Sequence, residues 1–584
     1  MDKCKLKIID AANIQIGEQY VNIEKWEWVF LGTDTCTREK IIERLGTVNR
    51  FCYARELQEI SINYRDTYLD WLAHISMKQD QTIWWSTNIA YKSPYTSDLF
   101  LNHCYLGLVK KWIDTGVKNR IVLVENPWVL KSCLLSFRGT SADVIVNKAY
   151  FLKVKARRYL MSFSRLFFQL YNSLKLWIGS RAYLLLQNDC LMGKASRYDV
   201  DILSITWVED RSFDCEGKYS DPYIGILHKY YQMKGLKVLT TTLPIFPYRL
   251  LKKVYACRQV VPLVVFMKFT DIMRACLHSL LFKCNKENVE YDGLVTAPLF
   301  HYEMIYEKGQ VFCAVLHYLT CLRIFKSNAI SFRILLYPFE NQPWDKMMVL
   351  AQKHAKAKFK SIGCHNIGVP YFYLNFFLGH RENVLCPQPD IIASNGSYWA
   401  KVLRDAGFSC DIRNGGSLRF GSGIGKITGN TKPLQSYHVL VLFSASLNYS
   451  LDLMFYMLRT SRSENMYYIK PHPDTPAEII QKYTGLLPKN FRFVSGAMDE
   501  WMDKVGYAIH VGTNAAIECM MNGIKVFKYL PERIDLDPLL GLGFEQDTVS
   551  DKDILDYSNN NISKIPNDKL IAEPFNKEMW DGIL

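Results

Sequence analysis

The chain has 584 residues and a mass of 67.8 kDa, which exceeds the size that one hydrophobic core usually supports, so two or three domains are expected. Apolar residues make up 49% and charged residues 22% of the chain, and these globular values exclude a largely disordered protein. The formal net charge of +14 predicts an anionic partner, but charge alone does not distinguish nucleic acid, anionic lipid and phosphorylated substrates.

The first 125 residues alternate between expected strands and helices. We predict strands over residues 26–31, 84–90 and 120–125, with helices over residues 38–45 and 98–112. Alternation at this spacing is typical of a parallel, doubly wound α/β sheet.

Residues 142–182 interrupt this alternation with a basic and aromatic helical stretch. Helical spacing places many aromatic side chains on one side and the cations on another, as in a helix at a membrane surface. An insertion helix packed on the protein body would show the same pattern. The cations are Lys153, Lys155, Arg157, Arg158, Arg165, Lys175 and Arg181. Because no run reaches the roughly 20 apolar residues of a spanning helix, we expect peripheral contact with the inner face of the plasma membrane and no crossing.

Residues 199–242 predict a Rossmann-like strand–helix–strand unit. Its polar loop contains Ser212 and Tyr223, which we expect to bind substrate, and Asp221, a candidate catalytic acid. A loop of this composition can equally be only solvated. Residues 248–290 form a second basic helical stretch.

The alternation then resumes, with strands expected over residues 330–336, 361–364 and 390–393. A linker rich in Gly, Ser, Lys and Thr follows over residues 414–436. We therefore expect an N-terminal acceptor-side lobe over residues 1–420 that carries the basic insertion, a C-terminal nucleotide-binding lobe over residues 430–545, and a tail over residues 546–584.

Glu340 follows an expected strand and is flanked by prolines, with Asn341 and Gln342 beside it. A carboxylate there can remove a proton from an acceptor hydroxyl, and the amides can orient it or bind substrate. Glu340 is therefore the first candidate for the catalytic base, and His365 at the next strand end is the alternative. Glu340 could equally cap the helix that begins near residue 343, because acids favour helix N-termini.

The expected strand over residues 466–469 ends at Lys470, which is followed by Pro471, His472 and Pro473. The prolines fix their own φ angles and exclude helix before them, so an imidazole is placed at the carboxyl end of a strand. Imidazole can donate a hydrogen bond to a phosphate oxygen. Lys470 lies two residues earlier, on the same face of a regular strand. A purely structural turn is the alternative.

A further strand is expected over residues 507–511, followed by Gly512, Thr513 and Asn514 and a helix from residue 515. At such a helix start, backbone N–H groups and polar side chains point outward together and form a small anion cradle. An ordinary helix cap would use the same residues.

These two strand ends define the crevice in which nucleotides bind to open α/β sheets. Their pairing resembles the donor site of GT-B glycosyltransferases, and more narrowly the His-Pro and Ser/Thr-rich elements of bacterial sialyltransferases and capsule Kdo transferases. The resemblance covers roughly residues 330–535. It implies two Rossmann-like lobes that face a central cleft, with the donor nucleotide held by Lys470, His472, Pro473, Gly512, Thr513 and Asn514. Glu518 resembles the acid with which many GT-B enzymes hold a ribose or sugar hydroxyl.

The resemblance implies a glycosyltransferase of bacterial capsule or O-antigen biosynthesis that moves Kdo or a nonulosonic acid from a CMP donor to a glycan or lipid-linked acceptor. It implies no metal, no other cofactor and no nucleic-acid partner. A CDP-glycerol or CDP-ribitol phosphotransferase and a UDP- or GDP-sugar transferase remain open. An alternative of another class is a non-catalytic membrane-surface or nucleic-acid-binding assembly protein, because single-strand binders also pair cations with aromatic rings.

The sixteen cysteines are scattered, without CxxC motifs or Cys/His clusters of zinc spacing, and the N-terminus lacks a signal-peptide pattern. This pattern predicts reduced thiols in a cytoplasmic protein that has no structural metal.

Overall fold

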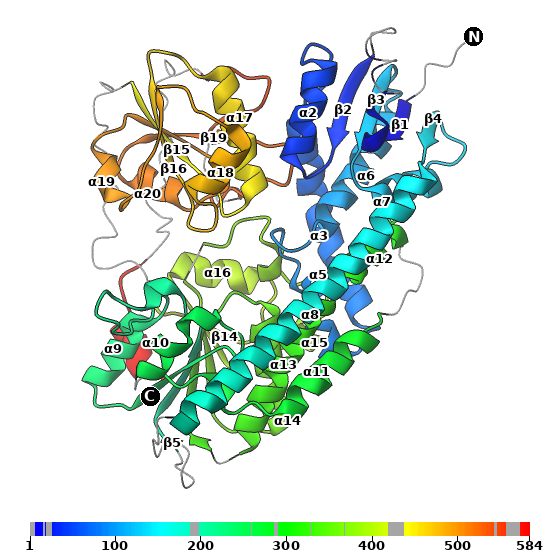
Figure 1. The fold of residues 1–584 in the computed structure, drawn as a ribbon. Coiled ribbons are helices and arrows are strands. Elements are labelled where there is room, and N and C mark those ends of the chain that lie inside the picture. The colour runs from blue at the N-terminus through cyan, green and yellow to red at the C-terminus, as the bar shows by residue number, and fades with distance from the viewer. Residues whose placement is uncertain are drawn as a thin grey trace.

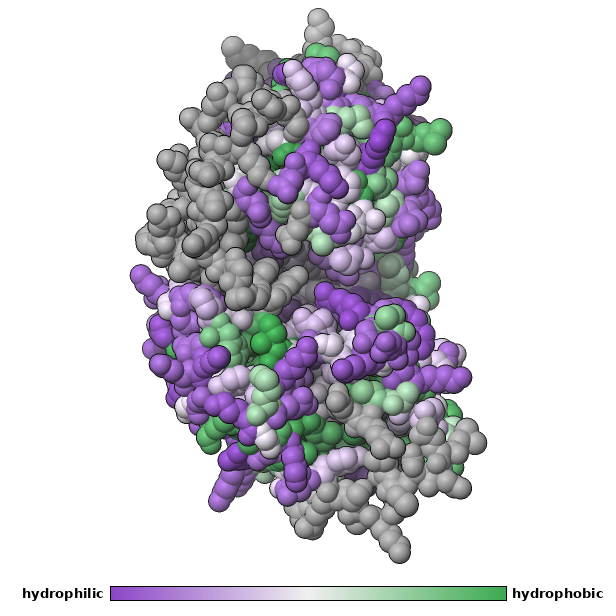
Figure 2. Space-filling view, turned by 90° about the vertical axis from the view of Figure 1, so that its left-hand side faces the viewer, coloured by the Kyte–Doolittle hydropathy of each residue, from purple (hydrophilic) through white to green (hydrophobic). Residues whose placement is uncertain are grey.

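The computed structural model describes residues 6–15, 18, 21, 26–186, 198–257, 260–284, 290–327, 329–366, 368–418, 437–541, 546–555 and 573–584. Within these residues the chain forms three parallel sheets of four or more strands, and we call the parts of the chain built on them the first, middle and third units in chain order. Figure 1 shows the third unit beside the first, with the middle unit below both. Figure 2 shows one side of the molecule, where hydrophilic side chains predominate and a hollow separates the upper and lower halves.

The first unit contains a four-stranded parallel sheet in the order β2-β3-β1-β4. Its strands are β1 (Leu6–Asp10), β2 (Glu27–Leu31), β3 (Arg120–Val124) and β4 (Ala142–Ile145). Its main helices are α2 (Thr35–Leu45), α3 (Ala54–Ser76), α6 (Leu99–Asp114) and α7 (Pro127–Ser136). Residues 1–420, which the sequence assigns to one lobe, therefore carry two separate sheets.

Residues 84–90 form no strand, so this part of the prediction is wrong. They span the end of one short helix, α4 (Gln81–Trp84), a turn over residues 85–87, and the start of a second helix, α5 (Asn88–Tyr91). The side chain of Asp80 accepts a hydrogen bond from the Ile83 N–H, and that of Thr87 accepts one from the Ala90 N–H. Both helices thus have the side-chain caps that favour helix initiation, and these override the strand preference of the tryptophans.

The basic stretch forms one long helix, α8 (Lys148–Leu186), which crosses the molecule diagonally in Figure 1. It packs against α11 (Phe269–Leu281), α12 (Ala297–Tyr306) and α13 (Lys308–Lys326). No helix in the described ranges is both long enough and apolar enough to span a membrane.

The middle unit contains a six-stranded parallel sheet in the order β14-β13-β12-β11-β6-β7. The strands are β6 (Ile202–Thr206), β7 (Val238–Thr242), β11 (Ile334–Pro338), β12 (Lys360–Cys364), β13 (Ile391–Ser394) and β14 (Asp411–Asn414). The helices include α9 (Gly225–Met233), α10 (Leu251–Ala256), α14 (Pro343–Ala355), α15 (Glu382–Leu385) and α16 (Ser397–Asp405). A short pairing of β5 (Tyr198–Asp199) with β10 (Ile330–Ser331) and a hairpin of β8 (Glu290–Tyr291) with β9 (Leu294–Val295) lie outside this sheet.

The third unit contains a six-stranded parallel sheet in the order β17-β16-β15-β18-β19-β20. The strands are β15 (His438–Leu442), β16 (Met466–Lys470), β17 (Phe491–Phe493), β18 (Tyr507–His510), β19 (Lys525–Tyr529) and β20 (Asp547–Val549). The helices are α17 (Leu447–Thr460), α18 (Ala477–Thr484), α19 (Asp499–Met502) and α20 (Ala515–Met521). Most of the predicted linker, residues 419–436, lies outside the described residues.

The end of the predicted tail returns to the middle unit. Its helix α21 (Lys577–Asp581) carries Trp580, which is fully buried and donates a hydrogen bond to the Gly415 carbonyl at 2.8 Å. The chain therefore passes between the middle and third units twice, once after β14 and once after β20.

Buried ion pairs join the first unit to the third. The guanidinium of Arg50 contacts Glu532 and Asp551, each at 2.7 Å. Arg533 donates to Asp452 at 2.7 Å, and Arg38 of the first unit contacts that same carboxylate group at 3.1 Å. All of these side chains are almost completely excluded from solvent, so each charge depends on its partners.

We expect Arg50→Ala to lower the stability of the fold strongly. The change leaves Glu532 and Asp551 buried without their shared cation, a loss that costs about 3–5 kcal/mol at other buried pairs. Arg55→Ala is the matched control, because Arg55 also pairs across this interface, with Asp553, but its side chain is 67% exposed. An exposed pair contributes below about 1 kcal/mol. Thermal unfolding should show a large shift for Arg50→Ala and a small one for Arg55→Ala, and equal shifts would contradict this account.

Candidate functional site

The strand order of the third sheet reverses between β15 and β18, because their connections run to opposite sides of the sheet. The loops that follow such neighbouring strands separate and leave a crevice at the carboxyl edge of the sheet. Two polar turns follow these strands, at residues 443–446 and 511–514. The sequence identified the second turn and missed the first, which contains Ser444 and Ser446.

His472 lies beside the turn that follows β15. Thr475 forms an isolated bridge with His472, and its hydroxyl donates to the Ser444 carbonyl at 2.9 Å. The Asp474 N–H donates to Nδ1 of His472 at 3.2 Å, and a carboxylate oxygen of Asp474 lies 3.5 Å from the same nitrogen. Pro473 lies inside this short turn. The turn is thus fixed to the adjacent strand end, while the His472 side chain stays one-third exposed.

Lys470 is the last residue of β16, and its ammonium donates to the Gly496 carbonyl. This contact directs the side chain toward the loop that follows β17. Lys470 therefore lies near the predicted phosphate site, but its ammonium group is hydrogen-bonded to a neighbouring loop.

The turn after β18 favours glycine at residue 512. Gly512 has φ +55°, and a Cβ there would lie 3.0 Å from Cβ of Leu536. Thr513 accepts from the Ala515 N–H through its hydroxyl at 3.4 Å. Asn514 is exposed, and its Oδ1 lies 3.8 Å from the position that a Cβ on Gly368 of the middle unit would occupy. The turn therefore faces the middle unit directly.

Glu518 lies in the first turn of α20 and is half-buried. Its place relative to Thr513 and Asn514 is the one that the sequence predicts.

Glu340 stands on the middle unit, just after β11, and is half-buried. Its carboxylate accepts a hydrogen bond from the Gln342 side chain at 2.6 Å. The helix cap is supplied by Asp345, which accepts from the backbone N–H groups of Glu340 and Gln342 at 3.0 and 3.2 Å. The carboxylate that caps this helix is therefore that of Asp345 and not that of Glu340, and the Gln342 side chain orients the Glu340 carboxylate.

Asn341 is buried, with φ +53°, and its amide donates to the Asn375 carbonyl at 2.6 Å. This contact fixes the loop that carries Glu340. The contacts of Asn341 therefore suit a residue that positions Glu340 better than one that binds substrate, which is the role that the sequence predicts.

His365 follows β12 and is fully buried, with its ring edge against Phe376. Burial lowers the pKa of His365 to about 3, although Asn395 opposes the shift. Such an imidazole is neutral and a poor proton acceptor at neutral pH. The geometry therefore favours Glu340 over His365 as the base.

Asp221 is buried in the loop before α9 and accepts hydrogen bonds from the backbone N–H groups of Tyr223 and Ile224, both at 2.7 Å. These bonds shape the loop and leave Asp221 poorly placed as a catalytic acid.

Ser212 is also buried, and its hydroxyl accepts a hydrogen bond from the Glu209 N–H at 3.1 Å. Tyr223 donates to Glu209 at 2.5 Å, and its carbonyl accepts from Asn366 at 3.0 Å. Through its carbonyl, Tyr223 therefore contacts Asn366, which lies just after β12.

A tyrosine pair that the sequence did not reveal connects the two walls. Tyr95, in the loop between α5 and α6, shares a hydrogen bond of 2.6 Å with Tyr373 of the middle unit. Partial burial raises the pKa of Tyr95, and hydrogen bonds with Tyr373 and Ser444 oppose the shift. Burial also raises the pKa of Tyr373, with smaller contributions from Tyr95 and the charge of Glu340. The pair thus lies between Glu340 and the turn after β15.

No group of three or more His, Cys, Asp or Glu side chains in the described ranges is arranged to hold a metal ion.

No protein-family model and no curated protein matches the chain. Among solved structures, MurG from Acinetobacter baumannii matches 61% of this chain and 87% of its own, at 10% identity and a TM-score of 0.34. A putative UDP-N-acetylglucosamine 2-epimerase from Listeria monocytogenes matches 56% and 79%, at 10% identity and a TM-score of 0.31. The β-Kdo 2,4 transferase KpsC from Thermosulfurimonas dismutans matches 38% and 78%, at 14% identity and a TM-score of 0.18.

The strand orders of the chain itself define its fold. The middle and third sheets are two Rossmann-like lobes whose carboxyl edges face each other, as in the GT-B fold that the sequence predicts. The first unit is an additional sheet.

We expect Gly512→Ala to lower the thermal unfolding midpoint more than Gly485→Ala. Both glycines have positive φ, so alanine costs about 1 kcal/mol or more at either position. Only Gly512 has a neighbour, Leu536, in the path of the added Cβ. Equal midpoints for the two variants would show that the turn after β18 accommodates a side chain.

Proposed function

We propose that this protein is a glycosyltransferase of bacterial capsule or O-antigen biosynthesis that transfers Kdo or a nonulosonic acid from a CMP donor to a glycan or lipid-linked acceptor. One observation carries the proposal: the His472 turn is hydrogen-bonded, through Thr475, to the end of β15, where the strand order reverses. This arrangement suits a donor with a single bridging phosphate.

In this proposal the donor phosphate lies against His472 and the polar turns after β15 and β18. Imidazole and backbone N–H groups stabilise the charge that develops on the phosphate as the bond to the sugar breaks. Glu340, on the opposite wall, takes the proton of the acceptor hydroxyl. At the same time the oxygen of that hydroxyl attacks the anomeric carbon of the donor sugar. CMP leaves with the electrons of the broken bond. Retention through a carboxylate nucleophile remains an alternative route.

Isothermal titration with CMP, CDP, UDP and GDP tests the donor assignment. We expect CMP to bind, and His472→Ala to weaken it at least about tenfold because a hydrogen bond to a charged oxygen is lost. His438→Ala is the matched control, since His438 begins β15 at the opposite edge of the sheet and should leave binding unchanged.

Preference for CDP would instead favour transfer of glycerol or ribitol phosphate, and preference for UDP or GDP would change the donor sugar. Absence of binding for all four nucleotides would reject the enzyme.

We further propose that the protein meets its acceptor at the inner face of the plasma membrane through the outer face of α8. Leu160, Phe167, Tyr171, Ile178 and Leu185 are all at least 59% exposed, and their spacing of four or seven residues places them on one side of the helix.

The charge of α8 supports an anionic lipid surface as the partner. The helix contains no acidic residue, and the exposed Lys153, Arg157 and Lys175 lie beside the apolar row. The adjacent α11 adds exposed Phe269 and Leu277. Cations flanking an apolar stripe are the pattern of an interfacial helix.

We expect the protein to sediment with phosphatidylglycerol vesicles, less with phosphatidylcholine vesicles, and less at high salt because screening weakens the attraction. Phe167→Glu should reduce sedimentation strongly, since it places a charge in the apolar row. Leu486→Glu, at a 95% exposed apolar site on the third unit, should have no effect. Equal losses for both variants, or self-association of the free protein through α8, would argue against a lipid surface.

A further inference from the structure

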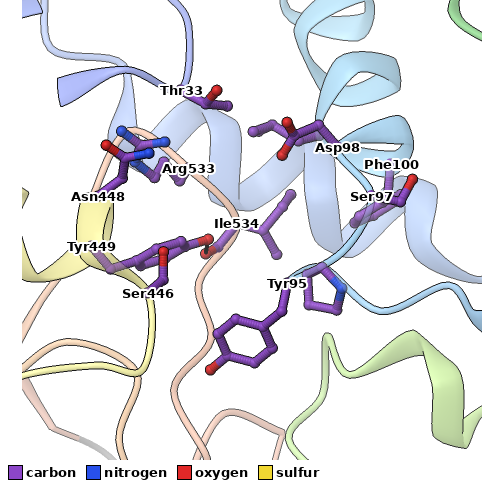
Figure 3. A pocket seen from close by; sticks show the side chains of 12 residues that line it. Thr33, Tyr95, Ser97, Asp98, Phe100, Ser446, Asn448, Tyr449, Arg533 and Ile534 are labelled. Carbon is purple, nitrogen blue, oxygen red and sulfur yellow. Dashed lines mark hydrogen bonds between the residues drawn. The ribbon is translucent and has the colours of Figure 1, made fainter. Parts of the chain in front are cut away.

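A pocket of about 210 Å³ lies where the first and third units meet (Figure 3). Its first wall comes from the loop between α5 and α6 and the start of α6, and includes Tyr95 and Asp98. Its opposite wall comes from the start of α17 and the loop after β19, and includes Asn448, Tyr449 and Arg533. The first unit is therefore needed to complete the pocket.

Asp98 presents a carboxylate to this pocket. It occupies the N-cap position of α6, yet its side chain accepts no capping hydrogen bond. Figure 3 shows the carboxylate directed toward the wall that carries Asn448 and Arg533. Burial raises the pKa of Asp98, while Arg533 and Arg158 oppose the shift. A carboxylate in this position is available to accept hydrogen bonds from a ligand.

The opposite wall is held rigidly. Arg533 donates to Asp452 at 2.7 Å and to the Thr35 hydroxyl at 2.9 Å. The hydroxyl of Tyr449 donates to the Ile534 carbonyl at 2.8 Å, and the side-chain oxygen of Asn448 accepts from the Thr35 N–H at 3.5 Å. The groups that face the pocket are therefore fixed before any ligand arrives, which lowers the entropic cost of binding.

The size and chemistry of the pocket suit a single sugar ring. Its volume is below the roughly 300 Å³ at which pockets for drug-sized ligands begin. Carboxylate, amide and guanidinium groups can bond to neighbouring hydroxyls, and the rings of Tyr95 and Tyr449 supply apolar surface for the C–H face of a sugar.

We propose that this pocket binds one sugar residue of the acceptor glycan, so that the first unit selects the acceptor. The pocket shares Tyr95 and Ser446 with the neighbourhood of the donor turns, and Tyr95 also contacts Tyr373 on the wall that carries Glu340. A sugar held here therefore lies beside the donor site. That the bound sugar belongs to the acceptor rests on the proposed transferase function.

Saturation-transfer NMR with the methyl glycosides of glucose, galactose, N-acetylglucosamine and Kdo tests the pocket in the full-length protein. We expect at least one glycoside to bind, and Asp98→Asn to weaken it at least about tenfold because a charged acceptor is replaced by a neutral amide. Asp114→Asn, at the exposed far end of the same helix, should bind as the unaltered protein does. CMP titration and thermal unfolding of Asp98→Asn should be unchanged.

Binding of none of the four glycosides, or equal binding by Asp98→Asn and the unaltered protein, would overturn the pocket assignment. If Asp98→Asn fails to fold, Tyr95→Phe and Asn448→Ala provide independent tests from the two walls. A protein that binds a glycoside through Asp98 but binds no nucleotide would retain the sugar pocket and lose the transferase function.

Discussion

The buried carboxylate of Asp452 is the contact on which the arrangement of the units depends. Arg533 of the third unit and Arg38 and Thr35 of the first unit converge on it, at distances of 2.5 to 3.1 Å. Such charges must be paired because water cannot reach them. A second buried pair, between Lys92 and Glu382 at 2.7 Å, joins the first unit to the middle one. The first unit thus contacts both lobes and fixes one side of the cleft between them.

The two walls of the cleft differ in how their polar groups are held. On the third unit, short turns between strands and helices carry His472 and Asn514, and backbone constraints such as the positive φ of Gly512 set their positions. On the middle unit, two hydrogen bonds position Glu340: the Gln342 side chain donates to its carboxylate, and the Asp345 carboxylate accepts from its backbone N–H. In the proposed function, the rigid turns would bind a phosphate of fixed shape, and Gln342 would stay hydrogen-bonded to Glu340 in either charge state of that carboxyl group.

The sequence predicted the two Rossmann-like lobes because their buried strands are short apolar runs that end at Pro, Gly or Asn. The prediction of a strand at residues 84–90 failed because the side chains of Asp80 and Thr87 cap two short helices there. The sequence did not separate the first sheet from the middle one, since strand pairing between distant segments leaves no local pattern. For the same reason it missed Tyr95, whose importance arises from contact with Tyr373, 278 residues away. The burial that weakens His365 as a base is likewise a tertiary property.

The return of the chain to the middle unit at α21 has a consequence for how the lobes are connected. The chain crosses between the same pair of lobes after β14 and again after β20, and Trp580 fixes the end of the second crossing in the middle unit. A chain cut between β14 and β15 would leave the third unit joined to α21, which Trp580 anchors in the middle unit. A single cut at that crossing therefore does not by itself release the third unit.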